Sequence, residues 1–420
     1  MWRALYTAFL YVATPFVLAR LWWRGRREPG YREDVAERFG ASELAPKPKL
    51  LWLHAVSVGE ARACAPLVRA LQREYPDHDV LLTCLTAAGR ETIKQVYGES
   101  VLSAYLPYDY PWAVQRFLEH FRPRLGVLVE TEIWPNLVRA CADNGVPLLL
   151  ANARMSGQSA RGYQRFAGLV RPAFASLAAA CAQGAADAQW LSRLGVTQVT
   201  VTGNLKFDIE PDPAKAEEGR AFRAALRQRK VLLLASTREG EDELLLSGLG
   251  AQDEGTLIVL VPRHPQRFDA VAALAQRLGF TLARRSLGEA PNQGRRLYLG
   301  DTMGEMAFYY ALADVAVIGG SFEPLGGQNL IEACAAGVPV VTGPHMYNFA
   351  DVTRLAVAAQ AAIQAEDAAS ALRAARDLLE DPQRCAQMGI AGKALCAQHR
   401  GAAERHLAVC RGLLRAPAPG

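Results

Sequence analysis

Residues 315–349 have the sequence VAVIGGSFEPLGGQNLIEACAAGVPVVTGPHMYNF, which predicts a strand, a glycine-rich turn, a helix and a second strand in succession. The strands are expected at 315–318 and 338–341. Gly326 and Gly327 have no Cβ atom, so the backbone can bend sharply there and a ligand can approach closely. The helix is expected to begin at Gln328 and Asn329 with Glu332 in its first turn, and the free N–H groups of such a terminus favour phosphate. An ordinary βαβ crossover, whose glycines serve only the turn, fits the stretch equally well.

The length and composition of the chain indicate a folded protein of more than one domain. With 420 residues, two or three domains are expected. Half of the residues are hydrophobic (50%) and 21% are charged, which is typical of a large core. The net charge of +5 suits an anionic ligand or membrane surface and does not indicate nucleic acid. The eight cysteines form no C-x-x-C pair, which favours buried, reduced thiols in the cytosol over zinc or disulfides.

Short apolar strands alternate with helical segments along most of the chain. Strands are predicted at 50–56, 80–85, 125–129, 148–151 and 199–201 and, after a charged linker with prolines (203–216), at 231–235, 257–261 and 297–299. This alternation predicts α/β domains with doubly wound parallel sheets. Ligands of such sheets bind beyond the carboxyl ends of the strands. The residues predicted at these ends in the first half are Glu60, Glu130, Glu132, Asn152 and Arg154.

The N-terminal segment from residue 4 to residue 23 is almost entirely apolar or aromatic, interrupted by Pro15 and Arg20. About 20 such residues can span a bilayer, and a helix lying in the membrane interface is an equal alternative. A helix docked on the protein's own core is a further alternative. A cleaved signal peptide fits poorly, because no small-x-small site follows. The arginines that follow favour a cytoplasmic location for the rest of the chain; they are Arg24, Arg26 and Arg27.

Several residues at predicted strand ends have the chemistry of an active site. Arg263 follows a strand where its guanidinium can hold a phosphate through paired hydrogen bonds. Glu60 is a candidate general base, although an acid that stabilises the first turn of its helix is the simpler interpretation. Lys206 is a further candidate, with a solvated surface lysine as the alternative. Asp77-His78-Asp79 precedes a strand, at the wrong end for a metal–nucleotide site, so no metal is expected.

Motifs along nearly the whole chain resemble those of the Kdo (3-deoxy-D-manno-octulosonic acid) transferases of Gram-negative bacteria. The resemblance includes the N-terminal apolar helix. The motifs are WLHAVSVGE (52–60), LPYDYP (106–111), ETEIWPNL (130–137), NARMS (152–156), GNLKFD (203–208), VPRHPQRF (261–268), GDTMGEM (300–306), GGSF and GGQNLIEA (319–333), and GPHMYNF (343–349).

The resemblance implies a GT-B glycosyltransferase fold, in which two Rossmann-like domains face a cleft. Residues 1–27 would be a membrane anchor or interfacial helix, 28–208 the acceptor domain, and 209–420 the CMP-sugar-binding domain, with its last helices able to pack back on the first domain. The family implies an inverting enzyme without cofactor or metal. It moves Kdo from CMP-Kdo to a lipid A precursor (lipid IVA) at the cytoplasmic side of the cell inner membrane, in lipopolysaccharide assembly.

The resemblance also implies roles for particular residues. Glu60 corresponds to the catalytic base, and Glu130 and Lys206 to supporting residues at the reacting centre. Gln328 stands where many members have histidine, and the following ACAAGVPV is closer to general GT-B enzymes, so donor contacts there are expected to differ in detail. The residues that correspond to CMP contacts are Pro262, Arg263, Met303, Gly304, Glu305, Asn329, Leu330, Ile331 and Glu332.

Three other functions are alternatives to Kdo transfer. A sugar-nucleotide epimerase of the same fold would not need the N-terminal helix. A transferase with another donor is a second alternative, but the E-x₇-E signature of many retaining enzymes fails, because Pro324 stands eight residues before Glu332. A non-catalytic membrane scaffold would not need acids and bases at so many strand ends.

Overall fold

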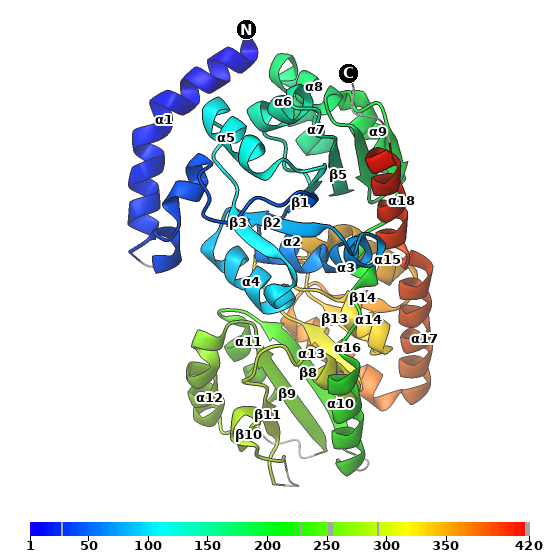
Figure 1. Ribbon diagram of the computed structural model, residues 1–420. Coiled ribbons are helices and arrows are strands. Elements are labelled where there is room, and N and C mark those ends of the chain that lie inside the picture. Colours follow the sequence, from blue (N-terminus) through cyan, green and yellow to red (C-terminus); the bar gives the residue numbers. More distant parts are fainter. Residues whose placement is uncertain (27, 227–228, 251–254, 292–293, 416–420) are drawn as a thin grey trace. The chain divides into compact units, whose positions relative to one another are not determined.

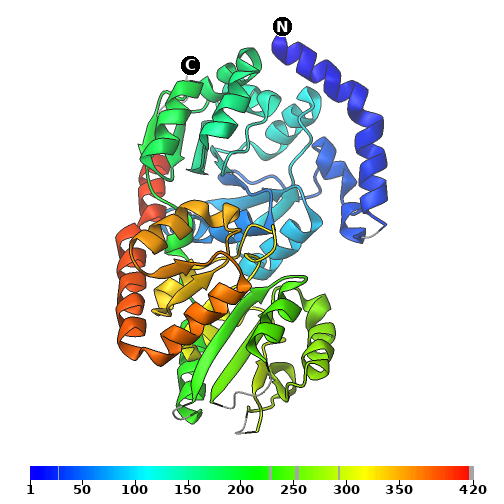
Figure 2. The ribbon, with the colours of Figure 1, turned by 180° about the vertical axis from the view of Figure 1, so that it is seen from behind.

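The structure is a computed structural model that describes residues 1–26, 28–226, 229–250, 255–291 and 294–415. Arg27, one of the arginines expected after the N-terminal segment, lies outside the described residues. The chain divides into two compact units. Unit 1 comprises Met1–Ile209 and Arg400–Gly420, and unit 2 comprises Glu210–His399. Each unit has its own parallel sheet with helices around it (Figures 1 and 2).

The sheet of unit 1 has seven parallel strands in the order β3-β2-β1-β4-β5-β6-β7. The strand Leu50–His54 (β1), third in this order, is buried on both faces: Leu51 and Leu53 belong to one core cluster, and Leu50 and Trp52 belong to the other. This burial explains why the strands have continuous apolar sequences rather than alternating ones. The strands are β1 (Leu50–His54), β2 (Asp79–Cys84), β3 (Leu102–Tyr105), β4 (Leu125–Val129), β5 (Leu148–Ala153), β6 (Ala179–Ala182) and β7 (Val199–Val201).

The sheet of unit 2 also has seven parallel strands, in the order β10-β11-β9-β8-β12-β13-β14. In both sheets the strand order reverses beside the first strand, which places ligand-binding loops at the carboxyl edge near that point. The strands are β8 (Lys230–Thr237), β9 (Thr256–Pro262), β10 (Leu282–Arg284), β11 (Leu297–Leu299), β12 (Val315–Ile318), β13 (Val340–Thr342) and β14 (Ala362–Gln364).

Most helices of each unit connect successive strands. Those of unit 1 are α1 (Trp2–Arg24), α2 (Val58–Ala63), α3 (Ala65–Glu74), α4 (Ala87–Tyr97), α5 (Pro111–Phe121), α6 (Pro135–Asp143), α7 (Gly157–Gln164), α8 (Ala167–Ala175), α9 (Ala185–Leu194) and α18 (Ala402–Arg415). Those of unit 2 are α10 (Pro213–Ala225), α11 (Glu241–Leu249), α12 (Phe268–Arg277), α13 (Met306–Leu312), α14 (Ile331–Ala336), α15 (Ala350–Ala358), α16 (Ala368–Glu380) and α17 (Pro382–His399). The last helix, α18, packs against α3 of unit 1, and Leu407 and Cys410 belong to the unit-1 core (red in Figure 1).

The predicted α/β class with two parallel sheets is confirmed, but two boundaries in the 315–349 stretch were wrong. The helix begins at Ile331 rather than at Gln328, because the Asn329 side chain accepts the N–H of Ile331 in a turn that precedes the helix. The second strand begins at Val340 rather than at Val338, because the N–H of Val338 bonds to the carbonyl of Ala333 at the end of α14. Gly337, at φ +80°, makes that helix end possible.

The N-terminal apolar segment forms helix α1, which lies along the outside of unit 1 (dark blue in Figures 1 and 2). Polar side chains fasten it: Thr14 Oγ1 lies 2.8 Å from Tyr110 Oη, and Asn136 Nδ2 donates to Thr7 Oγ1 at 3.0 Å. The opposite face of the helix is apolar and exposed; its large residues are Leu5, Phe9, Val12 and Phe16. Among the described helices, only α1 is long and apolar enough to cross a membrane. Only 6% of its apolar 18-residue stretch is buried.

The loop after β12 is closed by the loop after β13. Tyr347 Oη donates to the carbonyl of Pro324 at 2.7 Å, and the N–H of Asn348 donates to the carbonyl of Gly326 at 3.0 Å. Gly326 and Gly327 have φ values of +91° and +77°. A Cβ atom at Gly326 would collide with the Asn348 side chain, and one at Gly327 would collide with Met346. The two glycines therefore allow one loop to pack on the other.

Gly326→Ala is expected to destabilise unit 2 more than Gly288→Ala does. Both glycines have a left-handed backbone, at φ +91° and +67°, which costs an alanine about 1–2 kcal/mol. Gly288 has open space where its Cβ would be, whereas Gly326→Ala must also push the Asn348 side chain aside, at about 1–3 kcal/mol more. The measurement is the free energy of unfolding in urea. Equal losses in the two variants would show that the loop packing contributes nothing.

Candidate active site

Glu60 lies in the first turn of α2, the helix that follows β1 at the carboxyl edge of the unit-1 sheet. Its carboxylate accepts the backbone N–H of Val56 at 2.7 Å and the hydroxyl of Ser57 at 2.8 Å. The Ser57 hydroxyl oxygen in turn accepts the N–H of Glu60 at 3.3 Å. Ser57 thus caps the N-terminus of α2, and Glu60 does act at its helix terminus as the simpler sequence interpretation held.

The pKa of Glu60 is nevertheless raised, to about 7. Burial of the carboxylate is the largest cause, and the negative charge of Glu130 is the second. The hydrogen bonds from Ser57 and Val56 lower the pKa and do not offset the burial. A carboxyl group with a pKa near neutrality can accept a proton and release it again at physiological pH.

Glu130 follows β4, the neighbour of β1 in the sheet, and is a non-glycine residue at φ +62°. Its Oε1 lies 3.5 Å from Lys206 Nζ, and both side chains are partly buried. Glu132 lies nearby, and its pKa is raised by burial and by the charge of Glu130. The structure thus brings Glu60, Glu130 and Lys206 together, as a group of carboxylates with one ammonium beside them.

In unit 2, Pro262 ends β9 and Arg263 begins the following turn. The N–H of Arg263 donates to the carbonyl of Thr237 at 2.9 Å, which joins the turns after β8 and β9. The pKa of the neighbouring His264 is lowered by burial and by the charge of Arg238. His264 is therefore neutral near pH 7, and the positive charge in this turn comes from the arginines.

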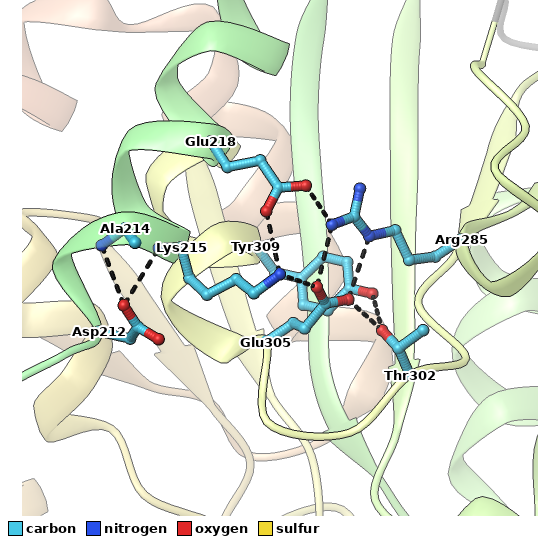
Figure 3. A network of polar contacts seen from close by, with 8 residues as sticks. All are labelled: Asp212, Ala214, Lys215, Glu218, Arg285, Thr302, Glu305 and Tyr309. Carbon is cyan, nitrogen blue, oxygen red and sulfur yellow. Dashed lines mark hydrogen bonds and ion pairs between the residues drawn. The ribbon is translucent and has the colours of Figure 1, made fainter.

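The loop after β11 carries Met303, Gly304 and Glu305. Met303 is exposed, and Gly304 has φ +80° with open space beside it. The Glu305 side chain is buried and held by Arg285, whose Nη2 donates at 2.9 Å, and by Lys215 at 2.6 Å (Figure 3). The hydrogen bond from Arg285 is the largest cause that lowers the pKa of Glu305, to about 2. Glu305 is therefore a permanent anion that fixes this loop.

The residues predicted to contact CMP around the start of α14 differ in how far they are exposed to solvent. Asn329 Oδ1 accepts the N–H of Ile331 at 3.0 Å, and its Nδ2 donates to Glu332 at 2.9 Å. Leu330 and Ile331 are buried, at 0% and 3% exposure, so neither residue presents appreciable surface to a ligand. Since α14 has only six residues, few peptide dipoles are aligned at its N-terminus.

Glu241 is a site residue that sequence reasoning missed. It is fully buried, and its carboxylate accepts the N–H groups of Gly320 at 2.6 Å, Phe322 at 2.9 Å and Arg238 at 2.8 Å. It therefore holds the loops after β8 and β12 in place. The sequence feature that could have indicated Glu241 is the acidic segment Glu239–Glu243 after a strand. Acidic residues are common in the first turn of any helix, so this segment does not stand out.

Other features of the described chain do not join this set of residues. An open hollow of about 550 Å³ lies after β13, between Pro344 and Gln364, and includes none of the residues predicted to contact CMP. Among the described residues no group of three or more His, Cys, Asp or Glu side chains has the arrangement of a metal site.

The comparisons with known proteins agree with one another. Residues 33–209 match the family model described as 3-Deoxy-D-manno-octulosonic-acid transferase (kdotransferase), and residues 287–395 match Glycosyl transferases group 1. The 3-deoxy-D-manno-octulosonic acid transferase of Bordetella pertussis is 46% identical over 97% of this chain and 98% of its own. That of Haemophilus influenzae is 36% identical over 97% of each chain.

A solved structure, the UDP-GlcNAc 2-epimerase from Neisseria meningitidis bound to UDP-GlcNAc, has a TM-score of 0.58 at 14% identity. It covers 87% of this chain and 100% of the epimerase, and likeness at this identity shows the fold alone. The two parallel α/β units and the glycosyltransferase match together identify the GT-B fold.

Proposed function

The chain belongs to the Kdo transferase family, and we propose that it transfers Kdo from CMP-Kdo to a lipid A precursor. A hydroxyl oxygen of the acceptor attacks the anomeric carbon of Kdo from the face opposite the phosphate, so the configuration inverts. The bond from that carbon to the phosphate oxygen breaks, and CMP leaves with the electron pair. The acceptor's proton goes to Glu60, and neither metal nor cofactor takes part.

The observation that carries this proposal is the largely buried carboxylate of Glu60 at the carboxyl edge of the sheet, close to Glu130 and its partner Lys206. With a pKa of about 7, the carboxylate is about half ionised at pH 7 and largely ionised above it, and it binds a proton more strongly than an exposed glutamate does. The ammonium of Lys206 lies beside Glu130 and offsets its negative charge, which reduces the net negative charge of the group of carboxylates. Glu130 and Lys206 are thus the residues that set the electrostatics of proton transfer.

The residues of unit 2 bind the CMP portion of the donor in this proposal. Arg263 is the cation for the phosphate, and the exposed Met303–Gly304 backbone and Asn329 supply further polar contacts. Positioned cations and N–H donors of this kind stabilise a leaving phosphate by several kcal/mol. The network of Glu305 with Arg285 and Lys215 gives the loop a fixed shape before the donor binds.

Helix α1 places the enzyme at the cytoplasmic side of the inner membrane, and we propose that it lies in the membrane interface without crossing it. The hydrogen bonds of Thr7 and Thr14 to unit 1 would have to break in a helix that spans the bilayer. The exposed apolar face fits the shallow acyl region, and tryptophans beside arginines fit the headgroups. These residues are Trp22, Trp23, Arg20, Arg24 and Arg26.

The reaction is tested with CMP-Kdo and a tetraacylated lipid A precursor, with the product read by mass spectrometry. The wild type is expected to add Kdo, whereas Glu60→Gln should lose nearly all turnover, because the amide keeps the shape but cannot accept the proton. CMP affinity, measured by calorimetry, should be unchanged in the variant. If the folded variant keeps more than a few per cent of turnover, the base is another residue.

The pH dependence of transfer is expected to follow Glu60. Turnover should fall about tenfold per pH unit below the pKa of about 7, because only the ionised carboxylate accepts the proton. Glu130→Gln removes a charge that raises this pKa, so the midpoint should move to lower pH whatever the loss in maximal rate. The exposed Glu99→Gln is the control and should leave the midpoint in place. A midpoint that does not move in Glu130→Gln would contradict the assignment.

Membrane attachment is tested by placing charges on the outer face of α1. Phe9 and Val12 are 67% and 80% exposed, so the double variant Phe9→Glu, Val12→Glu is expected to fold, leave the membrane fraction and act slowly on acceptor in vesicles. Transfer to detergent-dispersed acceptor should survive. The control, Leu287→Glu with Ile390→Glu, changes apolar residues of unit 2 that are 66% and 69% exposed. Full sedimentation of the α1 variant in high salt would exclude this attachment.

A further inference from the structure

The C-terminal helix α18 is fastened to the segment of unit 1 that carries Lys206. The Asp208 carboxylate accepts the N–H of Gly401 at 2.7 Å and that of Ala403 at 2.6 Å, and so caps the start of α18. From within the helix, Arg405 Nε donates to the carbonyl of Thr202 at 2.7 Å. The residues on both sides of Lys206 are therefore held by the end of the chain.

His406 is the buried side chain of α18 that faces this region, with 0% exposure. Its Nδ1 lies 2.7 Å from the carbonyl of Ala402, so the proton is on Nδ1. Its Nε2 is then free to accept the backbone N–H of Asn152 at 2.9 Å. Burial lowers the pKa of His406 to about 4, which keeps the ring neutral and preserves the lone pair on Nε2.

Asn152 needs such a partner because its backbone departs from the strand. It is a non-glycine residue at φ +52°, and the register between β5 and β6 shifts between Leu150 and Ala153. A left-handed residue inside a strand persists only where its surroundings fix it. The hydrogen bond to His406, a residue of α18, stabilises this backbone conformation of Asn152.

Two lines of hydrogen bonds run from Asn152 to Lys206. In the first, Asn152 Oδ1 accepts the N–H of Leu205 at 3.0 Å. In the second, Gln183 Nε2 donates to the carbonyl of Asn152 at 2.9 Å, and Gln183 Oε1 accepts from Asn204 Nδ2 at 3.0 Å. Asn204 Oδ1 then accepts the N–H of Lys206 at 2.9 Å. Asn152 thus holds the backbone at Leu205 directly, and it holds the N–H of Lys206 through Gln183 and Asn204.

We propose that His406 and Asp208 are positioning residues, through which α18 holds the Lys206 segment in the geometry that keeps Lys206 Nζ beside Glu130. The proposal rests on the proposed function, because the roles of Lys206 and Glu130 are assigned there. His406 acts through its Nε2 acceptor and Asn152, and Asp208 acts through the cap that it forms on α18. Neither residue touches the substrate.

The matched variants are His406→Gln and His406→Leu. The amide oxygen of glutamine can replace Nε2 as the acceptor for Asn152, whereas leucine fills the space without an acceptor. His406→Leu is expected to lower kcat by about 10- to 100-fold, the effect of misplacing a group by about 1 Å. The KM for CMP-Kdo should stay within about twofold, because the donor residues lie in unit 2. His406→Gln should keep most of the wild-type kcat.

Hydrogen exchange read by mass spectrometry gives a second measurement that does not depend on activity. In His406→Leu the amides of residues 203–208 should exchange faster, while those of β1 and β4 keep their protection. Asp208→Asn leaves the buried imidazole of His406 in place and weakens the hydrogen bonds that cap α18. It should therefore give the same rise in exchange and the same loss of kcat as His406→Leu. This variant takes the place of His406→Leu if the leucine protein does not fold.

The outcomes separate the two proposals. If the wild type transfers no Kdo, the proposed function fails, and the exchange data still decide whether α18 holds the segment. If the wild type is active and folded His406→Leu and Asp208→Asn keep full kcat and slow exchange, the positioning role is wrong. Equal losses in the glutamine and leucine variants would also overturn it, because the acceptor would then make no difference.

Discussion

The turns of this structure depend on buried or half-buried carboxylates that accept backbone N–H groups. Where a parallel strand turns into a helix, the ladder and the helix each leave N–H groups without a partner, and such groups are costly away from water. Glu60 takes that of Val56, Glu241 takes those of Gly320 and Phe322, and Asp208 takes those of Gly401 and Ala403. Asp109 does the same for Asn136 and Leu137. The loops that carry the candidate site are shaped by these bonds.

The sequence predicts the parallel sheets and the carboxyl-edge residues well, because both follow from local patterns. Continuous apolar runs mark strands such as β4, and acids directly after them mark the edge. Less apolar strands such as β3 and β6, LSAY and AACA, carry little signal of their own and form because neighbouring strands complete their ladders. Contacts between residues that are distant in sequence cannot be predicted in this way. His406, which bonds to Asn152, lies 254 residues away, and no local pattern joins the two.

The N-terminal helix has contacts that hydropathy alone does not indicate. By composition α1 can span a bilayer, and its polar side chains also hydrogen-bond to the rest of unit 1. Tyr6 hydrogen-bonds to Asp109, whose carboxylate also takes the N–H groups at the start of α6. The helix therefore shares a partner with the motif that contains Glu130 and Glu132. In the proposed membrane attachment, a docked helix with one apolar outer face would fix both the distance and the orientation of unit 1 relative to the lipid surface, which a flexible anchor would not do.

Glutamates of the same type take opposite states in the two units, and the balance of burial and pairing decides which. Glu305 has Arg285 and Lys215 against its carboxylate, and the charge-assisted hydrogen bonds outweigh its burial and hold its pKa at about 2. Glu60 has a hydroxyl and one N–H as partners and a like charge nearby, so burial prevails and its pKa rises to about 7. An anion that never changes its protonation is suited to holding a loop. A carboxylate poised near neutrality is suited to moving a proton, and a cation placed directly on Glu60 would remove that property. Lys206 bonds to Glu130 instead, which keeps an ammonium in the site without converting Glu60 into a second Glu305.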